Sequence, residues 1–374
     1  MAKNKNQQTR RDMLLFILGI AILLTNQVFA QDRGTDFGSG ENKPVTRTEQ
    51  EIKDLIVQEG KKQPVWWSEV KVDYPSTLNL DFPGSVPDSG WDNQRNVGQF
   101  IWDIVNPNPH RWRPGIKLFH TLLQRHKDDV NKRNQIMRDM GSMYFRFEQD
   151  YARAAFWWKN SGSLQNFPGM AAQLAECYWR LGNKQMALDE LEKQPVYLSQ
   201  IKLLGDMGET DKALKYCESL SKSNPLIANF YAGDACRIVG RNKEALEYYR
   251  KATAAPRVDH AKTETFRTRA EANILGLRAF VMLDLKNVAY GTYRSESMGY
   301  EAPIHVEVTV KSGVITDVKV TDHREKQFYS SITATCRQIK EKQGVNGVDA
   351  TSGATMTSEA IINATAKALA GAIN

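Results

Sequence analysis

The feature that most constrains the fold is a pattern that occurs three times between residues 132 and 285. In each copy a glycine is followed five residues later by an alanine, and four residues beyond that by a larger side chain. The three copies are Gly182, Ala187 and Leu191; Gly208, Ala213 and Cys217; Gly240, Ala245 and Tyr249. The glycine permits a tight turn, the alanine lets two helices approach closely, and the larger residue fills the groove between them. The pattern therefore predicts helix–turn–helix units.

An earlier copy, within SMYFRFEQDYARAAFWW, places Ala154 and Trp158 in the same roles. These units resemble the tetratricopeptide repeat, whose period is about 34 residues. The three glycines are spaced by 26 and 32 residues, so one unit is shortened. The resemblance implies a solenoid, because such units bury their apolar faces only by stacking. Its concave face is expected to dock a peptide or protein, and a scaffold without a dedicated ligand is the alternative.

The chain has four cysteines, none of them in C-x-x-C or C-x-x-C-H spacing. This argues against structural zinc, thioredoxin-like chemistry and covalent haem. An exported chain could pair its cysteines in disulfides. However, Cys177, Cys217 and Cys236 fall at interior positions of the repeats. We therefore expect buried free thiols at these three positions.

Residues 1–30 have the order of an export signal, with a basic stretch, the apolar MLLFILGIAILL and then Ala30 at a plausible cleavage point. Twelve strongly apolar residues are short for a membrane span. A cleaved signal peptide is therefore favoured over an uncleaved anchor formed by residues 13–30. The protein is expected to be exported, periplasmic or extracytoplasmic. Its net charge of +7 comes with no basic stripe interleaved with aromatics, so we expect no nucleic-acid partner.

Three further segments precede the repeats. Residues 31–45 are polar and glycine-rich and predict a flexible leader. Residues 46–60 predict a helix with a capping box of Thr48 and Glu51. Residues 62–118 are rich in Pro, Asn, Asp and Trp, and predict a packed irregular subdomain, with an exposed aromatic binding face as the alternative. The whole segment 46–131 receives no function from its sequence.

After a closing helix over residues 270–285, the apolar period changes from helical to two. The sequence APIHVEVTVKSGVITDVKVTDH predicts a hairpin that turns at Ser312-Gly313. One face is expected to carry Ile304, Val306, Val308, Val310, Val314, Thr316, Val318 and Val320. Helices are predicted over 330–342 and from residues 352–358 to the end of the chain. The change of period also predicts that residues 286–374 fold and accept a cofactor on their own.

Residues 288–374 contain a further series of short motifs, in this order: Gly291-Thr292-Tyr293, Gly299-Tyr300, the hairpin, His323-x-Glu325, Asp349-x-Thr351-Ser352-Gly353-Ala354-Thr355 and Thr357-Ser358. This series resembles the small FMN-binding domain of the C subunit of sodium-pumping NADH:quinone oxidoreductase and of the G subunit of the Rnf complex. It covers under a quarter of the chain. Ser295 departs from the pattern, because many relatives have glycine there.

The resemblance implies that Thr355 carries FMN through a phosphoester bond. A periplasmic flavin transferase would install the cofactor from FAD with Mg²⁺. A helix N-terminus suits a phosphate, and Gly353 and Ala354 leave room for it. The other residues expected to bind the cofactor are Asp349, Thr351, Ser352, Thr357 and Ser358. The alternative is that residues 352–358 only begin a helix.

Four further residues of this domain have two interpretations each. His323 and Glu325 can lie near the flavin, but a packing or surface role is the favoured interpretation. Tyr293 and Tyr300 are interpreted as core aromatics rather than as partners that stack on the flavin ring.

The sequence thus predicts a multidomain protein, with an all-α tetratricopeptide-like solenoid over 132–287 and a small α+β FMN-binding domain over 288–374. We expect an electron-transfer flavoprotein or redox-complex subunit rather than a stand-alone enzyme, with no metal and no catalytic residue of its own. The flavin would perform the redox chemistry between extracytoplasmic protein partners, or within a membrane redox complex. Two alternatives are an interaction protein with an unflavinylated C-terminal domain, and a subunit that delivers electrons to an extracytoplasmic reductase.

Overall fold

The computed structural model describes residues 46–374, apart from 85–89, 282–284, 301, 326–329, 349–354 and 373–374. The predicted signal or anchor (1–30) and the leader (31–45) lie outside the described residues. Within the described part of the chain, none of the helices combines the length and the apolar character that a bilayer span requires.

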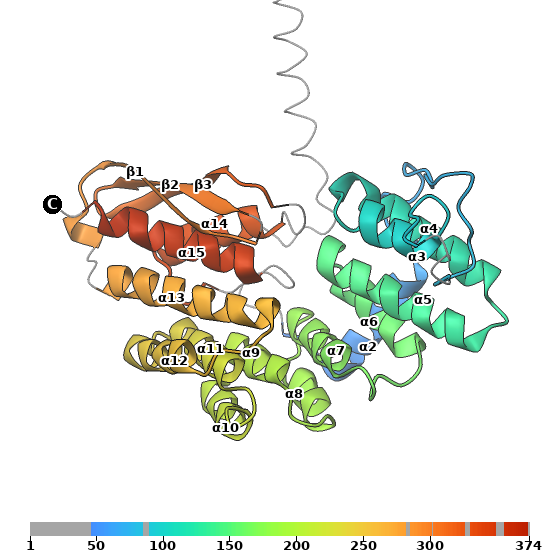
Figure 1. Cartoon of the computed structure of the whole chain (residues 1–374), viewed down its shortest axis with the longest axis horizontal. Helices are drawn as coiled ribbons and strands as arrows, with labels where there is room; N and C mark the ends of the chain where they lie inside the picture. Colours follow the sequence, from blue (N-terminus) through green and yellow to red (C-terminus); the bar gives the residue numbers. More distant parts are fainter. Residues whose placement is uncertain are drawn as a thin grey trace, which may run out of the picture. The chain divides into compact units, whose positions relative to one another are not determined.

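Helices dominate the chain up to residue 281, and a small sheet with two helices follows (Figure 1). The helices of the first part are α2 (Glu49–Lys61), α3 (Val97–Phe100), α4 (Trp112–Arg125), α5 (Val130–Met143), α6 (Tyr151–Asn160), α7 (Pro168–Arg180), α8 (Lys184–Glu192), α9 (Leu198–Asp206), α10 (Thr210–Leu220), α11 (Pro225–Ile238), α12 (Asn242–Ala254) and α13 (Ala261–Val281). The second part contains β1 (Gly291–Met298), β2 (Pro303–Lys311), β3 (Val314–Asp322), α14 (Ser330–Lys342) and α15 (Thr355–Ala370). This confirms the predicted combination of a helical region with a small α+β domain.

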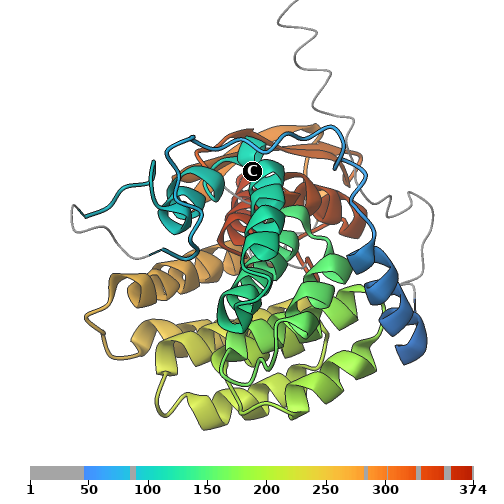
Figure 2. The same ribbon diagram turned by 90° about the vertical axis from the view of Figure 1, so that its right-hand side faces the viewer.

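The predicted N-terminal helix is α2, and its capping box is present. The Glu51 amide donates to the Thr48 hydroxyl at 3.3 Å, and the Thr48 amide donates to the Glu51 carboxylate at 2.7 Å. The helix, drawn in blue in Figure 2, packs against α6. A Cβ on Gly60 would lie 2.0 Å from the Phe156 ring, so the close approach of the two helices depends on glycine.

The Trp-rich segment is mostly irregular up to α4, with the short α3 within it, and its tryptophans differ in burial, with Trp67 half-buried against the core. Trp66 and Trp112 are buried, whereas Trp91 and Trp102 are exposed. Its buried side chains belong to one continuous hydrophobic core that extends from Ile52 to Ala235. The N-terminal segment therefore packs as one body with the helices that follow it.

The repeated sequence pattern corresponds to consecutive helix pairs. Gly182, Gly208 and Gly240 lie in the turns of α7–α8, α9–α10 and α11–α12, with φ of +104°, +78° and +77°. Such positive φ values favour glycine. The three alanines of the pattern are fully buried between helices: Ala187, Ala213 and Ala245. Successive pairs also pack on each other through α7, α9 and α11.

The four cysteines are buried and free, as predicted for the three in the helices. Burial raises the pKa of Cys217, Cys236 and Cys336 to about 11. These thiols are therefore protonated at neutral pH and are poor nucleophiles.

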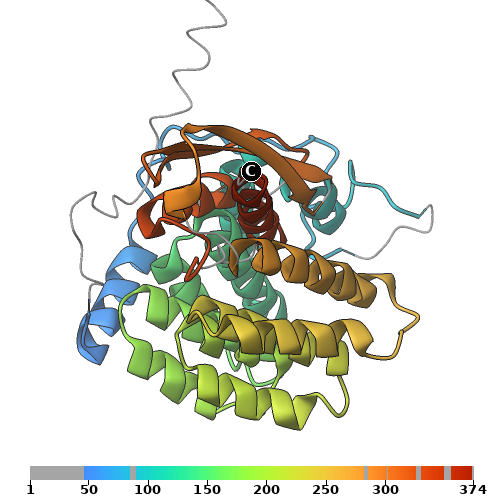
Figure 3. The ribbon, with the colours of Figure 1, turned by 90° about the vertical axis from the view of Figure 1, so that its left-hand side faces the viewer.

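The sheet of the C-terminal domain has the antiparallel order β1-β2-β3. The predicted turn between β2 and β3 is present, with positive φ at both Ser312 and Gly313. Helices α14 and α15 cover one face of the sheet, as Figure 3 shows. The hydrophobic core between the sheet and these helices uses buried residues from Val288 to Ala372 alone.

Two sequence predictions need correction here. The pairing register shifts between Thr309 and Val310, so that Val310 pairs with Ile315. A bulge of this kind adds one residue and reverses which side chains face the core. Ile315 is therefore 1% exposed and Val314 is 48% exposed, and Thr316 is exposed too, contrary to the predicted alternation. The closing helix is also longer than predicted, because α13 already begins at Ala261.

Candidate functional site

Helix α15, which begins at Thr355, is the central element of the C-terminal domain. Its residues from Thr357 to Ala366 are all buried, because the helix packs against β1 and β2, α14 and α13. Half of this stretch is alanine or isoleucine and the other half is polar, so a helix enclosed on several sides needs hydrogen-bond partners for its buried polar groups. Four neighbouring elements thus fix the position of α15, the helix that begins at Thr355.

The hydroxyl side chains at the start of α15 have different environments. Thr357 is 2% exposed, and its Oγ1 donates to the Glu325 carboxylate at 2.5 Å. Ser358 is 0% exposed, and its Oγ accepts a hydrogen bond from the Thr335 hydroxyl at 3.1 Å. Thr355 is half-buried. Among the described hydroxyls of this turn, Thr355 is therefore the one that a large cofactor can reach.

Glu325 joins two of the sequence motifs to α15. Its carboxylate accepts hydrogen bonds from the Tyr300 amide at 2.9 Å and from the Thr357 hydroxyl. Gly299 has no room for a side chain, because a Cβ there would lie 2.6 Å from Glu325 Oε1. The Gly299-Tyr300 motif, Glu325 and Thr357 are thus one structural unit, which we call the Glu325 clamp.

The remaining predicted site residues have several outcomes. His323 is half-buried, two residues before Glu325. Tyr293 is half-buried and packs against the core, but Tyr300 is 67% exposed, so its interpretation as a core aromatic is wrong. Five predicted cofactor-binding residues lie outside the described residues: Asp349, Thr351, Ser352, Gly353 and Ala354.

Sequence reasoning missed the residues that hold α15 from the helical region. Arg269 of α13 forms two hydrogen bonds to Glu359, at 2.9 and 2.7 Å. The Asn363 amide donates to the Asn273 side chain at 2.7 Å. The sequence signal for this contact is the spacing of Glu359 and Asn363, which follow Thr355 at intervals of four residues and therefore lie on one side of the helix.

A buried carboxylate lies behind this contact. Asp234 accepts hydrogen bonds from the Tyr249 hydroxyl at 2.6 Å and from the Asn273 amide at 3.4 Å. Burial, together with the nearby Glu359 carboxylate, raises the pKa of Asp234 to about 6. The surroundings of α15 on this side are therefore a network of buried polar groups rather than an apolar seam.

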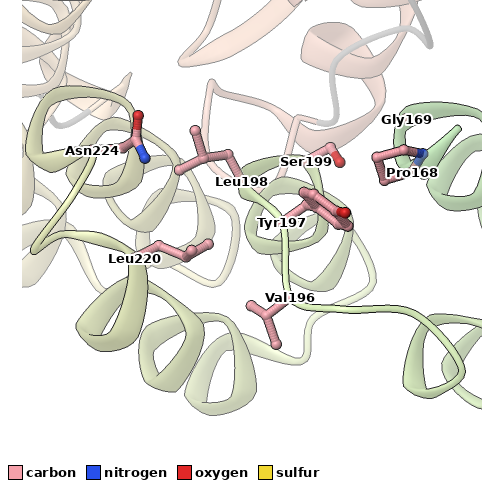
Figure 4. Close-up of a pocket in the computed structure, with 8 residues that line it drawn as sticks. All are labelled: Pro168, Gly169, Val196, Tyr197, Leu198, Ser199, Leu220 and Asn224. Carbon is pink, nitrogen blue, oxygen red and sulfur yellow. The ribbon is translucent and has the colours of Figure 1, made fainter. Parts of the chain in front are cut away.

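A separate hollow of about 300 Å³ lies on the helical region (Figure 4). Its lining is mainly apolar and comes from the ends of α7, α9 and α10: Pro168, Gly169, Val196, Tyr197, Leu198, Ser199, Leu220 and Asn224. None of these residues belongs to the C-terminal domain.

The described residues contain no group of three side chains suited to hold a metal ion.

Residues 299–370 match the model of the family described as the FMN-binding domain. The matched range begins at Gly299 of the Glu325 clamp and includes Thr355. It confirms the FMN-binding domain recognised in the C-terminal part of the sequence and supports FMN as the cofactor. The comparisons with curated proteins and with solved structures return no match.

Proposed function

We propose that the protein is an exported flavoprotein that carries FMN covalently on Thr355 and transfers electrons between extracytoplasmic redox partners. The observation that carries this proposal is the accessibility of Thr355 in a matched FMN-binding domain, beside two hydroxyls that are buried and already hydrogen-bonded. The residues present suit the group. The hydroxyl can form a phosphate ester, and the start of a long helix favours a phosphate. When bound, the flavin supplies the redox chemistry.

The attachment reaction would be a transfer from FAD. The Thr355 oxygen attacks the phosphorus on the FMN side of the pyrophosphate, the bond to the AMP phosphate breaks, and AMP leaves. The hydroxyl proton passes to a base of the flavin transferase, and Mg²⁺ neutralises the phosphates. The four cysteines are not alternative attachment residues, because all are buried and burial raises the pKa of their thiols, which keeps them protonated.

For the helical region we propose the tetratricopeptide-like function of docking a protein partner. The turns with positive φ, the buried alanines and the stacking of successive pairs support this assignment. The hollow of Figure 4 lies on this region and is large enough for one or two side chains of a partner. In this proposal the helices bring a redox partner to the flavin.

Covalent labelling tests the proposal. The full chain is co-expressed with a flavin transferase and denatured. Flavin fluorescence in a gel and peptide mass mapping then report the adduct. We expect Thr355→Ala to fold without covalent flavin, and Thr355→Ser to retain part of the label, because its hydroxyl remains. Undiminished flavin on Thr355→Ala, or an adduct on another residue, would contradict the proposal. An unlabelled wild type would favour the interaction-protein alternative.

Export has its own test. We expect the mature protein to lack residues 1–30, because of the order of basic, apolar and small residues in that segment. The intact mass reports both the cleavage and the flavin. If N-terminal sequencing finds residues 1–20 in the mature protein, the segment acts as an anchor instead.

A further inference from the structure

Helices α13 and α15 lie side by side and run in the same direction (Figure 1). Arg269 contacts Glu359, and Asn273, one turn later, contacts Asn363. Gly276 completes the close approach, because a Cβ there would lie 2.4 Å from Asn363 Oδ1. The helical region therefore contacts the C-terminal domain through the helix that begins at the attachment residue.

The face of α15 that meets α13 is also the face that carries Thr355. Residues four apart in a helix lie above one another, so Thr355, Glu359 and Asn363 form one row. One turn, about 6 Å along the axis, separates Thr355 from Glu359. A contact that fixes Glu359 in place therefore also fixes the side of α15 on which Thr355 lies and the direction in which that side faces.

Glu359 is held by a rigid partner. The Arg269 guanidinium donates to both of its oxygens, and the side chains are 11% and 5% exposed. The guanidinium carbon lies 4.4 Å from the ring centre of Phe230 and 4.7 Å from that of Phe266. The bidentate hydrogen bond and the contacts to two aromatic rings together leave the Arg269 side chain little conformational freedom.

The helical region also holds the chain before the attachment sequence. Arg237, near the end of α11, donates to the carbonyl oxygens of Val345 and Val348, both at 3.5 Å. Val345 and Val348 themselves are buried in the core of the C-terminal domain. The two sides of the attachment motif, residue 348 before it and Glu359 after it, thus both contact arginines of the helical region.

We propose that Arg269 is a positioning residue for flavin attachment, which holds the first turns of α15 through Glu359 and so presents the Thr355 hydroxyl to the flavin transferase. This inference rests on the proposed function. It adds a second role for the helical region, which becomes part of the acceptor site as well as a docking surface. Arg269 acts through the helix, and its guanidinium makes no contact with the transferase or the flavin.

The test uses the full chain, purified without flavin, with FAD, Mg²⁺ and a flavin transferase. Arg269→Met leaves Glu359 buried without its cation. We expect the initial rate of covalent labelling to fall by about tenfold or more, because small displacements of a reacting group are costly. Circular dichroism at the assay temperature checks that the variant is folded. Hydrogen exchange of the amides in residues 355–363 should become faster.

Two further variants give the comparison its meaning. Arg241→Met is the control for the loss of an arginine ion pair in the helical region, because Arg241 binds Asp211 and Glu244 and no carboxylate of α15. It should label at the wild-type rate. The double variant Arg269→Met with Glu359→Leu replaces the ion pair by apolar side chains that can pack together. It should recover the rate to within about threefold of the wild type, because the helix is held again without the arginine.

Several outcomes would overturn the inference. A wild-type rate in folded Arg269→Met would show that the contact is not needed. A double variant that is labelled as slowly as Arg269→Met would show that the transferase or the flavin contacts the guanidinium directly. If Arg269→Met does not fold, Arg269→Lys replaces it, since lysine keeps a cation beside Glu359 but cannot donate to both of its oxygens in the same fixed geometry, and a wild-type labelling rate in that variant contradicts the inference. Failure of the proposed function is distinct, because the wild type is then unlabelled or Thr355→Ala stays labelled.

Discussion

At the residue scale, the Glu325 clamp explains why glycine occupies position 299. A Cβ at that position would lie 2.6 Å from Glu325 Oε1 and 2.8 Å from the Ile304 side chain. Glu325 would have to move and give up its hydrogen bonds to the Tyr300 amide or to Thr357. The Gly299-Tyr300 motif is thus a packing requirement that links the connection between β1 and β2 to helix α15.

We predict that Gly299→Ala destabilises the protein by about 1–3 kcal/mol, the cost of a buried hydrogen-bonding group that loses its partner. Urea denaturation of the full chain measures the free energy of unfolding. Gly291→Ala is the control, because its Cβ would meet only the end of the Tyr293 side chain, at 3.1 Å, and that side chain can shift. Equal costs for the two variants would show that the clamp contributes nothing.

His120 provides a prediction about pH. Its ring lies between the edges of Trp67 and Trp157, with centroids 4.8 and 5.2 Å away, and Nε2 is buried without a hydrogen-bond partner among the described residues. Burial lowers the pKa of His120 to about 4, from the usual 6.5. Between these values the unfolded chain binds a proton that the folded chain does not bind. This residue therefore makes stability fall as the pH drops from 6.5 to about 4.

We expect His120→Phe to remove this effect, which amounts to roughly 3 kcal/mol over the full window. Buried Asp139 and Asp234 act in the opposite direction, because burial raises the pKa of each to about 6. The informative quantity is therefore the difference in unfolding free energy between variant and wild type, measured by denaturation at several pH values. A difference that does not change between pH 7 and pH 4 would contradict the prediction.

Some site residues could be predicted from sequence, and others could not. Thr355 could be predicted as the attachment residue because its motif is continuous along the chain, and this role stays a prediction. Arg269 and Asn273 each lie 90 positions before the α15 residues they bind, and that pairing depends on how two helices pack. A local pattern carries no information about such a partner, although the polar row on α15 did indicate that one exists.

At the element scale, the turns between the paired helices depend on glycine for a conformational reason. Gly208 has φ of +78°, and a Cβ there would meet no atom within 4 Å. We predict that Gly208→Ala costs about 1 kcal/mol from backbone strain alone. Gly169→Ala is the control, because its Cβ would also meet nothing but its φ is not positive, so helix propensity favours alanine there by about 0.5–1 kcal/mol. Opposite signs in urea denaturation are the expected result.

The elements themselves were predictable to different degrees. Helix α14 and the start of α2 agree with their sequence signals, because capping and apolar periodicity are local. The side-chain direction on β3 was wrong at Val314 and Thr316, because a single bulge reverses it. Bulges depend on the pairing of two strands, so the alternation of one strand does not reveal them.

At the scale of the whole molecule, the helical region and the C-terminal domain are joined by polar contacts rather than by a shared hydrophobic core. The hydrophobic cores are separate, since none of the buried residues in the clusters of the helical region lies beyond Leu277 and the core of the C-terminal domain begins at Val288. The contact between α13 and α15 is polar at Arg269–Glu359 and Asn273–Asn363. The helical region and the C-terminal domain thus have separate hydrophobic cores and are joined by buried polar contacts, from Arg269 and Asn273 to α15 and from Arg237 to the carbonyls of Val345 and Val348.

This arrangement bears on the predicted independence of residues 286–374, which stays a prediction. Water can solvate Glu359 and Asn363 in place of their partners on α13, so an isolated domain exposes polar groups rather than its core. We expect residues 286–374 to fold alone, with the circular dichroism of a mixed helix and sheet protein. Their thermal midpoint should be lower than that of the same domain in the full chain, because the junction with α13 is lost.

Ile361→Asp, which places a charge in the buried core of the domain, supplies the unfolded reference. If the isolated residues 286–374 give the same spectrum as that reference while the full chain is folded, the helical region is required for folding, and α15 is stable only within the whole molecule.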